Sequence, residues 1–150
     1  MTYTIAFFGT KPYDEVSFDK KFGFEIKYFK GHLNKNNVML TQGADAVCIF
    51  VNDIADAEVL KVMADNGVRL LALRCAGYNN VDLKKTAEYG IKVARVPGYS
   101  PEAVAEHAMA LALTANRHTH KAYIKCREND FSLNGLMGVD LYKKTAGIIG

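Results

Sequence analysis

The sequence predicts an α/β fold in which helices cover a parallel sheet on both faces. Over residues 1–100, short apolar runs alternate with segments of helical periodicity, which is the pattern that parallel sheets produce. One run, at 46–51, is continuously apolar, as expected of a central strand that is buried on both sides. Hydrophobic residues make up 49% of the 150 residues and charged residues 23%, a composition that supports a globular core.

Five apolar segments are predicted to be strands. They are residues 4–8, 25–29, 46–51, 69–73 and 92–96. Two of the helices between them end at a glycine: 57–66 at Gly67 and 82–89 at Gly90, where a left-handed residue closes a helix. Five strands in this rhythm predict a flavodoxin-like open sheet, and we expect residues 1–100 to form this domain.

A long helix is predicted to follow the sheet. Ser100 can cap its first turn, and Pro101 suits the first helical position. The helical pattern runs to about Asn129, and its first half is apolar on nearly all sides, which predicts burial between layers or domains. We expect residues 101–142, this helix and the loop after it, to connect two domains.

The last eight residues, 143–150, are predicted to be a buried strand that reaches a glycine at Gly150. Such a strand has no sheet partner left in the sequence, and its edge would be open. We therefore expect residues 143–150 to be the start of a second domain that is truncated here.

Composition excludes several other classes of protein. The net charge of +3 is spread along the chain without a basic cluster, which argues against a nucleic-acid partner. Three distant cysteines form neither a disulfide framework nor a zinc site and favour a reducing cytoplasm. The N-terminus lacks the pattern of a signal peptide, and the apolar run at 103–115 is shorter than the roughly 18–20 residues of a membrane span. The sequence thus predicts a cytoplasmic protein without a membrane partner.

Three ordered stretches resemble signatures of the D-2-hydroxyacid dehydrogenases. Residues 73–82, LRCAGYNNVD, are similar to the segment after the fourth strand in that family, particularly in its fermentative D-lactate dehydrogenases. Residues 95–107, RVPGYSPEAVAEH, resemble the start of the helix that joins the family's two domains. Residues 144–150, KTAGIIG, are similar to the first strand and first glycine of a Rossmann NAD-binding domain.

The resemblance implies an enzyme that transfers hydride between NADH and a 2-oxo acid, here pyruvate to D-lactate. Another 2-hydroxyacid dehydrogenase, such as a 2-hydroxyisocaproate type, is the alternative within the family. The family's catalytic Arg, Glu and His lie downstream of Gly150, so the resemblance implies that the isolated chain is inactive and holds no catalytic residue. It also implies a homo-oligomer, a dimer or tetramer.

The resemblance assigns five residues to binding. Backbone N–H groups of Ala76 and Gly77 would hold the substrate carboxylate, and small residues suit such an anion-binding loop. Tyr99 would approach the substrate, whereas Val104 and Gly150 would contact the cofactor NAD. The alternatives are that Gly77 belongs to a plain tight turn, that Tyr99 is a boundary aromatic and that Val104 is a core valine.

Other residues are weighed as structural. Arg74 could contact an anion but also suits a salt bridge at a strand end, and Cys75 fits a small buried thiol. His118 and His120 lie two apart on a helix and face differently, so no metal site is expected. Two other classes of function remain open: a receiver-type signalling module with Asp53 as phospho-acceptor, and a non-catalytic assembly domain that uses the apolar helix as a dimer surface.

Overall fold

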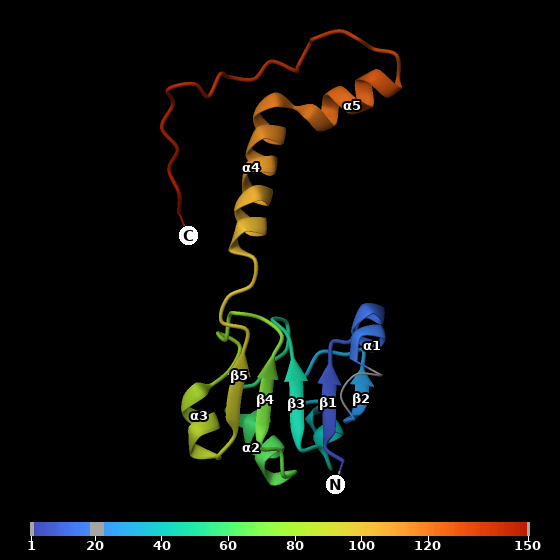
Figure 1. Ribbon diagram of the computed structural model, residues 1–150, viewed down its shortest axis with the longest axis vertical. Helices are drawn as coiled ribbons and strands as arrows, with labels where there is room; N and C mark the ends of the chain where they lie inside the picture. The colour runs from blue at the N-terminus through green and yellow to red at the C-terminus, as the bar shows by residue number, and fades with distance from the viewer. Residues whose placement is uncertain (1, 19–22, 150) are drawn as a thin grey trace. The chain divides into compact units, whose positions relative to one another are not determined.

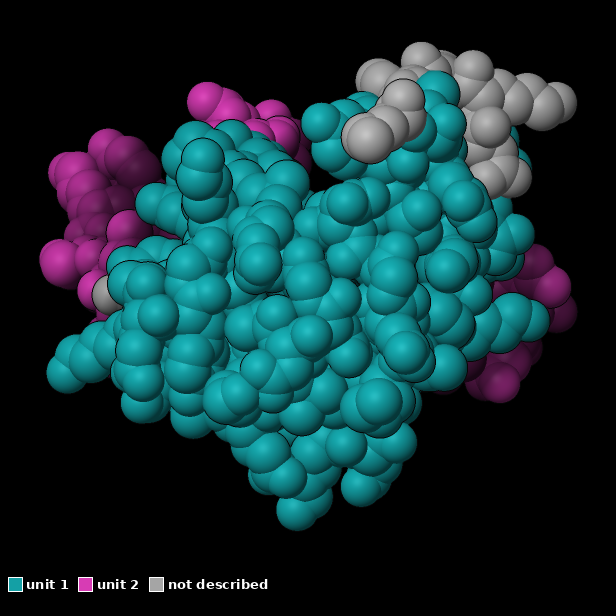
Figure 2. All heavy atoms as spheres, turned by 90° about the horizontal axis from the view of Figure 1, so that it is seen from below, with its two compact units in different colours: residues 1–99 teal, residues 100–150 magenta. Residues whose placement is uncertain are grey.

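The computed structural model describes residues 2–18 and 23–149. The chain divides into two compact units, residues 1–99 and residues 100–150, which are coloured separately in Figure 2.

Five parallel strands form the sheet of the first unit (Figure 1). They are β1 (Thr4–Phe8), β2 (Glu25–Phe29), β3 (Ala46–Ile49), β4 (Leu70–Leu73) and β5 (Lys92–Arg95). Their order across the sheet is β2-β1-β3-β4-β5, which is the order of flavodoxin-like folds. The predicted α/β fold and its five strands are confirmed. The strand β3 stops two residues earlier than predicted because the Phe50 N–H donates to the Asp53 side chain instead of a neighbouring strand.

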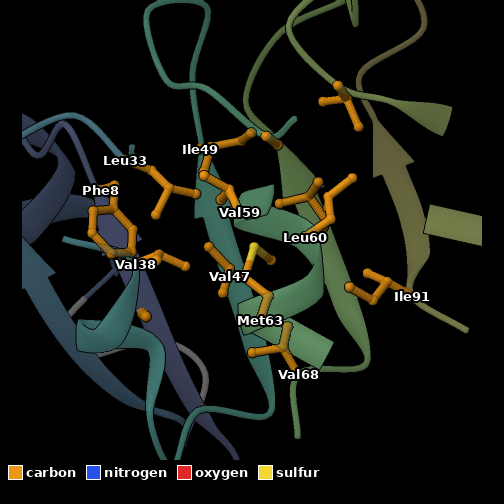
Figure 3. Packing of buried hydrophobic residues seen from close by; sticks show 14 of the residues in the cluster. Phe8, Leu33, Val38, Val47, Ile49, Val59, Leu60, Met63, Val68 and Ile91 are labelled. Carbon is orange, nitrogen blue, oxygen red and sulfur yellow. The ribbon is translucent and has the colours of Figure 1, made fainter. Parts of the chain in front are cut away.

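One face of the sheet carries the continuous core. Side chains of β1, β3 and β4 pack there against the helix α2 (Ala57–Asp65), as Figure 3 shows. Val47 and Ile49 of β3 and Leu60 and Met63 of α2 are completely buried. The opposite face is covered less evenly, since Phe7 and Cys48 are buried but Leu70 of β4 remains 38% exposed. The expectation of two covered faces thus holds only for part of the sheet within the described residues.

Two of the helices in the first unit end where the sequence predicts. Asp56 accepts a hydrogen bond from the Val59 N–H at the start of α2, and Asp82 caps α3 (Leu83–Glu88) in the same way. Gly67 and Gly90, with φ of 91° and 69°, follow these helices in the left-handed conformation. The helix α1 (Pro12–Phe18) and the 3₁₀ helix η1 (Val38–Thr41) were not predicted, because segments this short carry little periodicity.

The predicted long helix is two helices, α4 (Pro101–Arg117) and α5 (Thr119–Arg127). The break lies at His118, whose φ of 50° and ψ of 34° cannot continue a right-handed helix. Pro101 opens α4 as predicted, but Ser100 does not cap it. With φ of 36°, Ser100 is outside the extended conformation from which a cap side chain reaches the first turn, and its side chain makes no capping hydrogen bond.

Two further expectations for the second unit are not met within the described residues. The apolar side chains of α4 are exposed rather than buried, Val104 and Met109 by 59% each, because no described residue of the second unit covers them. Residues 143–149 form no strand, because a strand requires a hydrogen-bonded neighbour and no described strand pairs with them. Gly150 lies outside the described residues. No helix in the described part of the chain combines the length and the apolarity that crossing a bilayer requires.

Candidate functional site

A pocket of about 480 Å³ lies where the loops after β3, β4 and β5 meet, all within the first unit. It is lined by Phe50, Val51, Arg74, Cys75, Ala76, Gly77, Val96 and Tyr99. In open α/β sheets, ligands bind at the edge where the carboxyl ends of the strands meet. The structure therefore brings together three of the predicted binding residues, Ala76, Gly77 and Tyr99, at the edge where binding is expected.

The backbone N–H groups of Ala76 and Gly77 donate no hydrogen bond to any of the described residues. Their carbonyl oxygens, in contrast, accept hydrogen bonds. The Ala76 oxygen accepts from Arg95 Nη1 at 2.9 Å, and the Gly77 oxygen accepts from Cys75 Sγ at 3.2 Å. Two free amides beside the carboxyl end of a strand can bind an anionic oxygen. This part of the pocket is suited to a carboxylate.

Arg74 forms the salt bridge that the sequence offered as an alternative. Its Nη1 lies 3.3 Å from the buried Asp14, and its Nη2 donates to the Phe8 carbonyl at 2.7 Å. The guanidinium also stacks over the Phe7 ring at 4.4 Å. Arg74 thus ties the end of β4 to β1 and α1, and this fixes the start of the loop that carries Ala76 and Gly77.

Cys75 in the pocket lining and Cys48 in β3 are both buried cysteines. Burial raises the pKa of Cys48 to about 12, although the nearby Arg74 guanidinium opposes the shift. Burial also raises the pKa of Cys75, whose Sγ faces the Gly77 carbonyl. Because the thiolate is the reactive form, neither side chain is suited to nucleophilic attack at neutral pH.

The buried side chain of Asp53 stabilises the loop after β3 through hydrogen bonds. It is 1% exposed, and its carboxylate accepts hydrogen bonds from the Leu33 N–H at 2.6 Å and the Phe50 N–H at 2.5 Å. His32 Nδ1 lies 3.6 Å from the same carboxylate. A phospho-acceptor must be accessible, so these contacts argue against the receiver-type alternative. The sequence does not reveal this structural role, because no local motif shows which amides an aspartate meets.

Asn80 joins the two loops that line the pocket. Its Nδ2 donates to the Phe50 carbonyl at 3.0 Å and to the Asp53 carbonyl at 2.9 Å. The sequence marks Asn79 and Asn80 only as turn residues. Their position in a turn gives no signal that one of them bridges to another loop.

The other predicted binding residues are placed unequally. Tyr99 lines the pocket and is 64% exposed, which leaves its phenol accessible to a ligand. Val104 belongs to the second unit, whereas the pocket lies in the first, and Gly150 lies outside the described residues. Among residues 2–18 and 23–149, no three side chains are grouped so that they could hold a metal ion.

Comparison with known proteins assigns the family. Residues 5–134 match the catalytic domain of the D-isomer specific 2-hydroxyacid dehydrogenases. Over 97% of the chain, the sequence is 53% identical to 2-hydroxyacid dehydrogenase homolog 1 of Schizosaccharomyces pombe, of which it covers 45%. The chain thus spans about half the length of the curated relatives that it matches.

Two solved structures show the same fold. The apo-structure of D-lactate dehydrogenase from Escherichia coli superposes with a TM-score of 0.84 at 47% identity, over 98% of this chain and 48% of that one. The D-lactate dehydrogenase from Aquifex aeolicus, solved in complex with NAD and lactic acid, gives a TM-score of 0.72 at 26% identity, over 91% of this chain and 41% of that one. The family match covers most of the chain and the fold agrees with it, so this protein belongs to the D-isomer specific 2-hydroxyacid dehydrogenase family.

Proposed function

We propose that this chain supplies the substrate-binding part of an NAD-dependent D-lactate dehydrogenase, which reduces pyruvate to D-lactate. The observation that carries the proposal is the pair of free amides at Ala76 and Gly77 in the pocket. The similarity to D-lactate dehydrogenases, one of them solved with NAD and lactic acid, supports this choice of substrate.

The pocket offers distinct surroundings to the two ends of pyruvate. The carboxylate would accept hydrogen bonds from the Ala76 and Gly77 amides, and hydrogen bonds to a charged acceptor are stronger than neutral ones. The methyl group would face apolar side chains of Phe50, Val51 and Val96. The phenol of Tyr99 would contact the substrate from the accessible side of the pocket.

The described residues do not by themselves fit a dinucleotide. They contain no G-x-G-x-x-G loop between a strand and a helix, and residues 143–149 pair with no strand. Val104 offers only an exposed apolar side chain. The cofactor would supply the hydride, and we propose that residues beyond these 150 form most of its binding site.

The proposal also assigns a role to each part of the chain. Residues 1–100 would form the substrate-binding domain, 101–142 the connection between domains, and 143–150 the start of the NAD-binding domain, with Gly150 contacting NAD. We further propose that the protein is a homo-oligomer, a dimer or tetramer.

The product of the complete gene is expected to oxidise NADH with pyruvate and to release D-lactate, whereas residues 1–150 alone should show no turnover. The reason is that the site on this chain offers carboxylate binding but no general acid or cofactor site. Absorbance at 340 nm measures the oxidation of NADH by each protein. Chiral analysis identifies the lactate that is released. Release of L-lactate, or faster turnover of 4-methyl-2-oxopentanoate than of pyruvate, would contradict the proposed substrate. Turnover by residues 1–150 would contradict the proposal that the catalytic and cofactor-binding residues lie elsewhere in the complete protein.

A further inference from the structure

Two loops form opposing walls of the pocket. The loop after β3 carries Phe50 and Val51, and the loop after β4 carries Ala76 and Gly77. Backbone hydrogen bonds join these loops only at the two ends of the gap between them. At one end the Arg74 N–H donates to the Ile49 carbonyl at 3.0 Å.

At the other end of the gap, the Ala55 N–H donates to the Asn80 carbonyl and the Asp82 N–H donates to the Ala55 carbonyl, each at 3.0 Å. Between these ends, no backbone hydrogen bond between described residues crosses from 50–54 to 75–79. The separation of the walls therefore depends on side chains.

The side-chain amide of Asn80 connects the two loops. An asparagine Nδ2 has two hydrogens, and here both are used, one on the Phe50 carbonyl and one on the Asp53 carbonyl. The Asp53 carboxylate holds the Phe50 N–H from the other side. Both backbone polar groups of Phe50 are thus hydrogen-bonded. Its carbonyl accepts from the Asp53 N–H at 3.2 Å within its own loop and from Asn80 in the loop after β4.

We infer that Asn80 is a positioning residue, which sets the distance between the two pocket walls and thereby limits the length of the 2-oxo acid that the site accepts. The inference rests on the proposed function. Without the Asn80 amide, the wall at Phe50 and Val51 would keep the contacts of Phe50 with Asp53 and Arg74 but lose its side-chain hydrogen bonds to the loop after β4, and it could shift away from Ala76 and Gly77. A longer side chain would then fit, and pyruvate would be held less firmly.

The neighbouring Asn79 provides a matched control. It is the same residue type in the same turn and lies beside a hollow that it shares with Asn80, Val51 and Gly77. Its side chain is exposed and makes no hydrogen bond to any described residue. A change that acts through the turn in general would affect Asn79 and Asn80 variants alike.

The test compares N80A, N80D and N79A in the product of the complete gene, with NADH and either pyruvate or 4-methyl-2-oxopentanoate. For N80A and N80D we expect the KM for pyruvate to rise about fivefold to tenfold, as two lost hydrogen bonds suggest, with a smaller change in kcat. The ratio of kcat/KM for the longer acid to that for pyruvate should rise by a similar factor. N79A should stay close to wild type in all three quantities.

A second readout does not depend on turnover. The amide hydrogens of residues 50–53 should exchange faster in N80A than in wild type or N79A, because the loop has lost its outer support. Both loops keep their backbone hydrogen bonds at the two ends of the gap, so N80A is expected to fold. If N80A does not fold, the variant N80S, which keeps a small polar side chain, replaces it in the test.

The outcomes separate the two proposals. An active wild type with an unchanged substrate ratio in both Asn80 variants overturns the inference and leaves the proposed function standing. A wild type that reduces neither acid overturns the proposed function and with it this role of Asn80. Equal effects of N79A and N80A also overturn the inference, since they would show that the turn, not the bridge, matters.

Discussion

Replacing Asp53 with alanine is expected to lower the free energy of unfolding by about 3–5 kcal/mol, because it leaves the Leu33 and Phe50 amides without an acceptor. An unsatisfied buried donor costs about 1–3 kcal/mol, and hydrogen bonds to a charged group lie at the upper end of the range. The Asp53 side chain is completely buried, so water would replace the lost acceptor poorly. Few single substitutions in this chain should destabilise it more.

Urea denaturation followed by circular dichroism measures the effect of D53A. Asp65 provides the control, since its carboxylate pairs with Lys61 on the surface of α2 and both side chains are more than half exposed. Surface pairs of this kind contribute little, so D65A should shift the midpoint only slightly. D53N retains one acceptor oxygen and should fall between D53A and wild type. Equal midpoints for D53A and D65A would show that the buried carboxylate does not hold the loop.

The substitution G77V should raise the KM for pyruvate by about tenfold or more, which corresponds to about 1.4 kcal/mol of lost binding. A Cβ on Gly77 would meet no protein atom within 4 Å, and the residue is not among the glycines with positive φ. Valine is therefore tolerated by the fold itself. Its branched side chain would instead occupy space beside the free amides where the substrate carboxylate is proposed to bind.

Because a side chain at position 77 should affect substrate binding but not folding, thermal unfolding serves as the control for the kinetics of G77V. The thermal midpoint of G77V should stay within about 2 °C of wild type, and G77A should give a smaller rise in KM than G77V. A large fall in the midpoint would mean that the loop itself is disturbed. Unchanged kinetics in G77V would remove Gly77 from the site.

The strands and most helix ends of the first unit could be predicted because their causes are local. Apolar runs mark the strands, and Asp56, Asp82, Gly67 and Gly90 mark helix ends by their own chemistry. The errors fall where a distant partner decides. β3 ends early because the Phe50 amide meets Asp53, and residues 143–149 form no strand because no described strand pairs with them.

The candidate site was predictable to the same extent. Ala76, Gly77 and Tyr99 lie in motifs that resemble a known family, and the structure brings them to one pocket. Asp53 and Asn80 support that pocket through contacts between different loops. Which loops face each other follows from the order of the strands in the sheet, so no local motif could assign these two residues their roles.

The most direct test is a crystal structure of the complete protein with oxamate, an unreactive analogue of pyruvate, together with NADH. We expect the oxamate carboxylate to lie about 2.7–3.2 Å from both the Ala76 and the Gly77 nitrogen, with its other end toward Phe50 and Val51. An oxamate carboxylate bound elsewhere, with the Ala76 and Gly77 amides left without an acceptor, would contradict it.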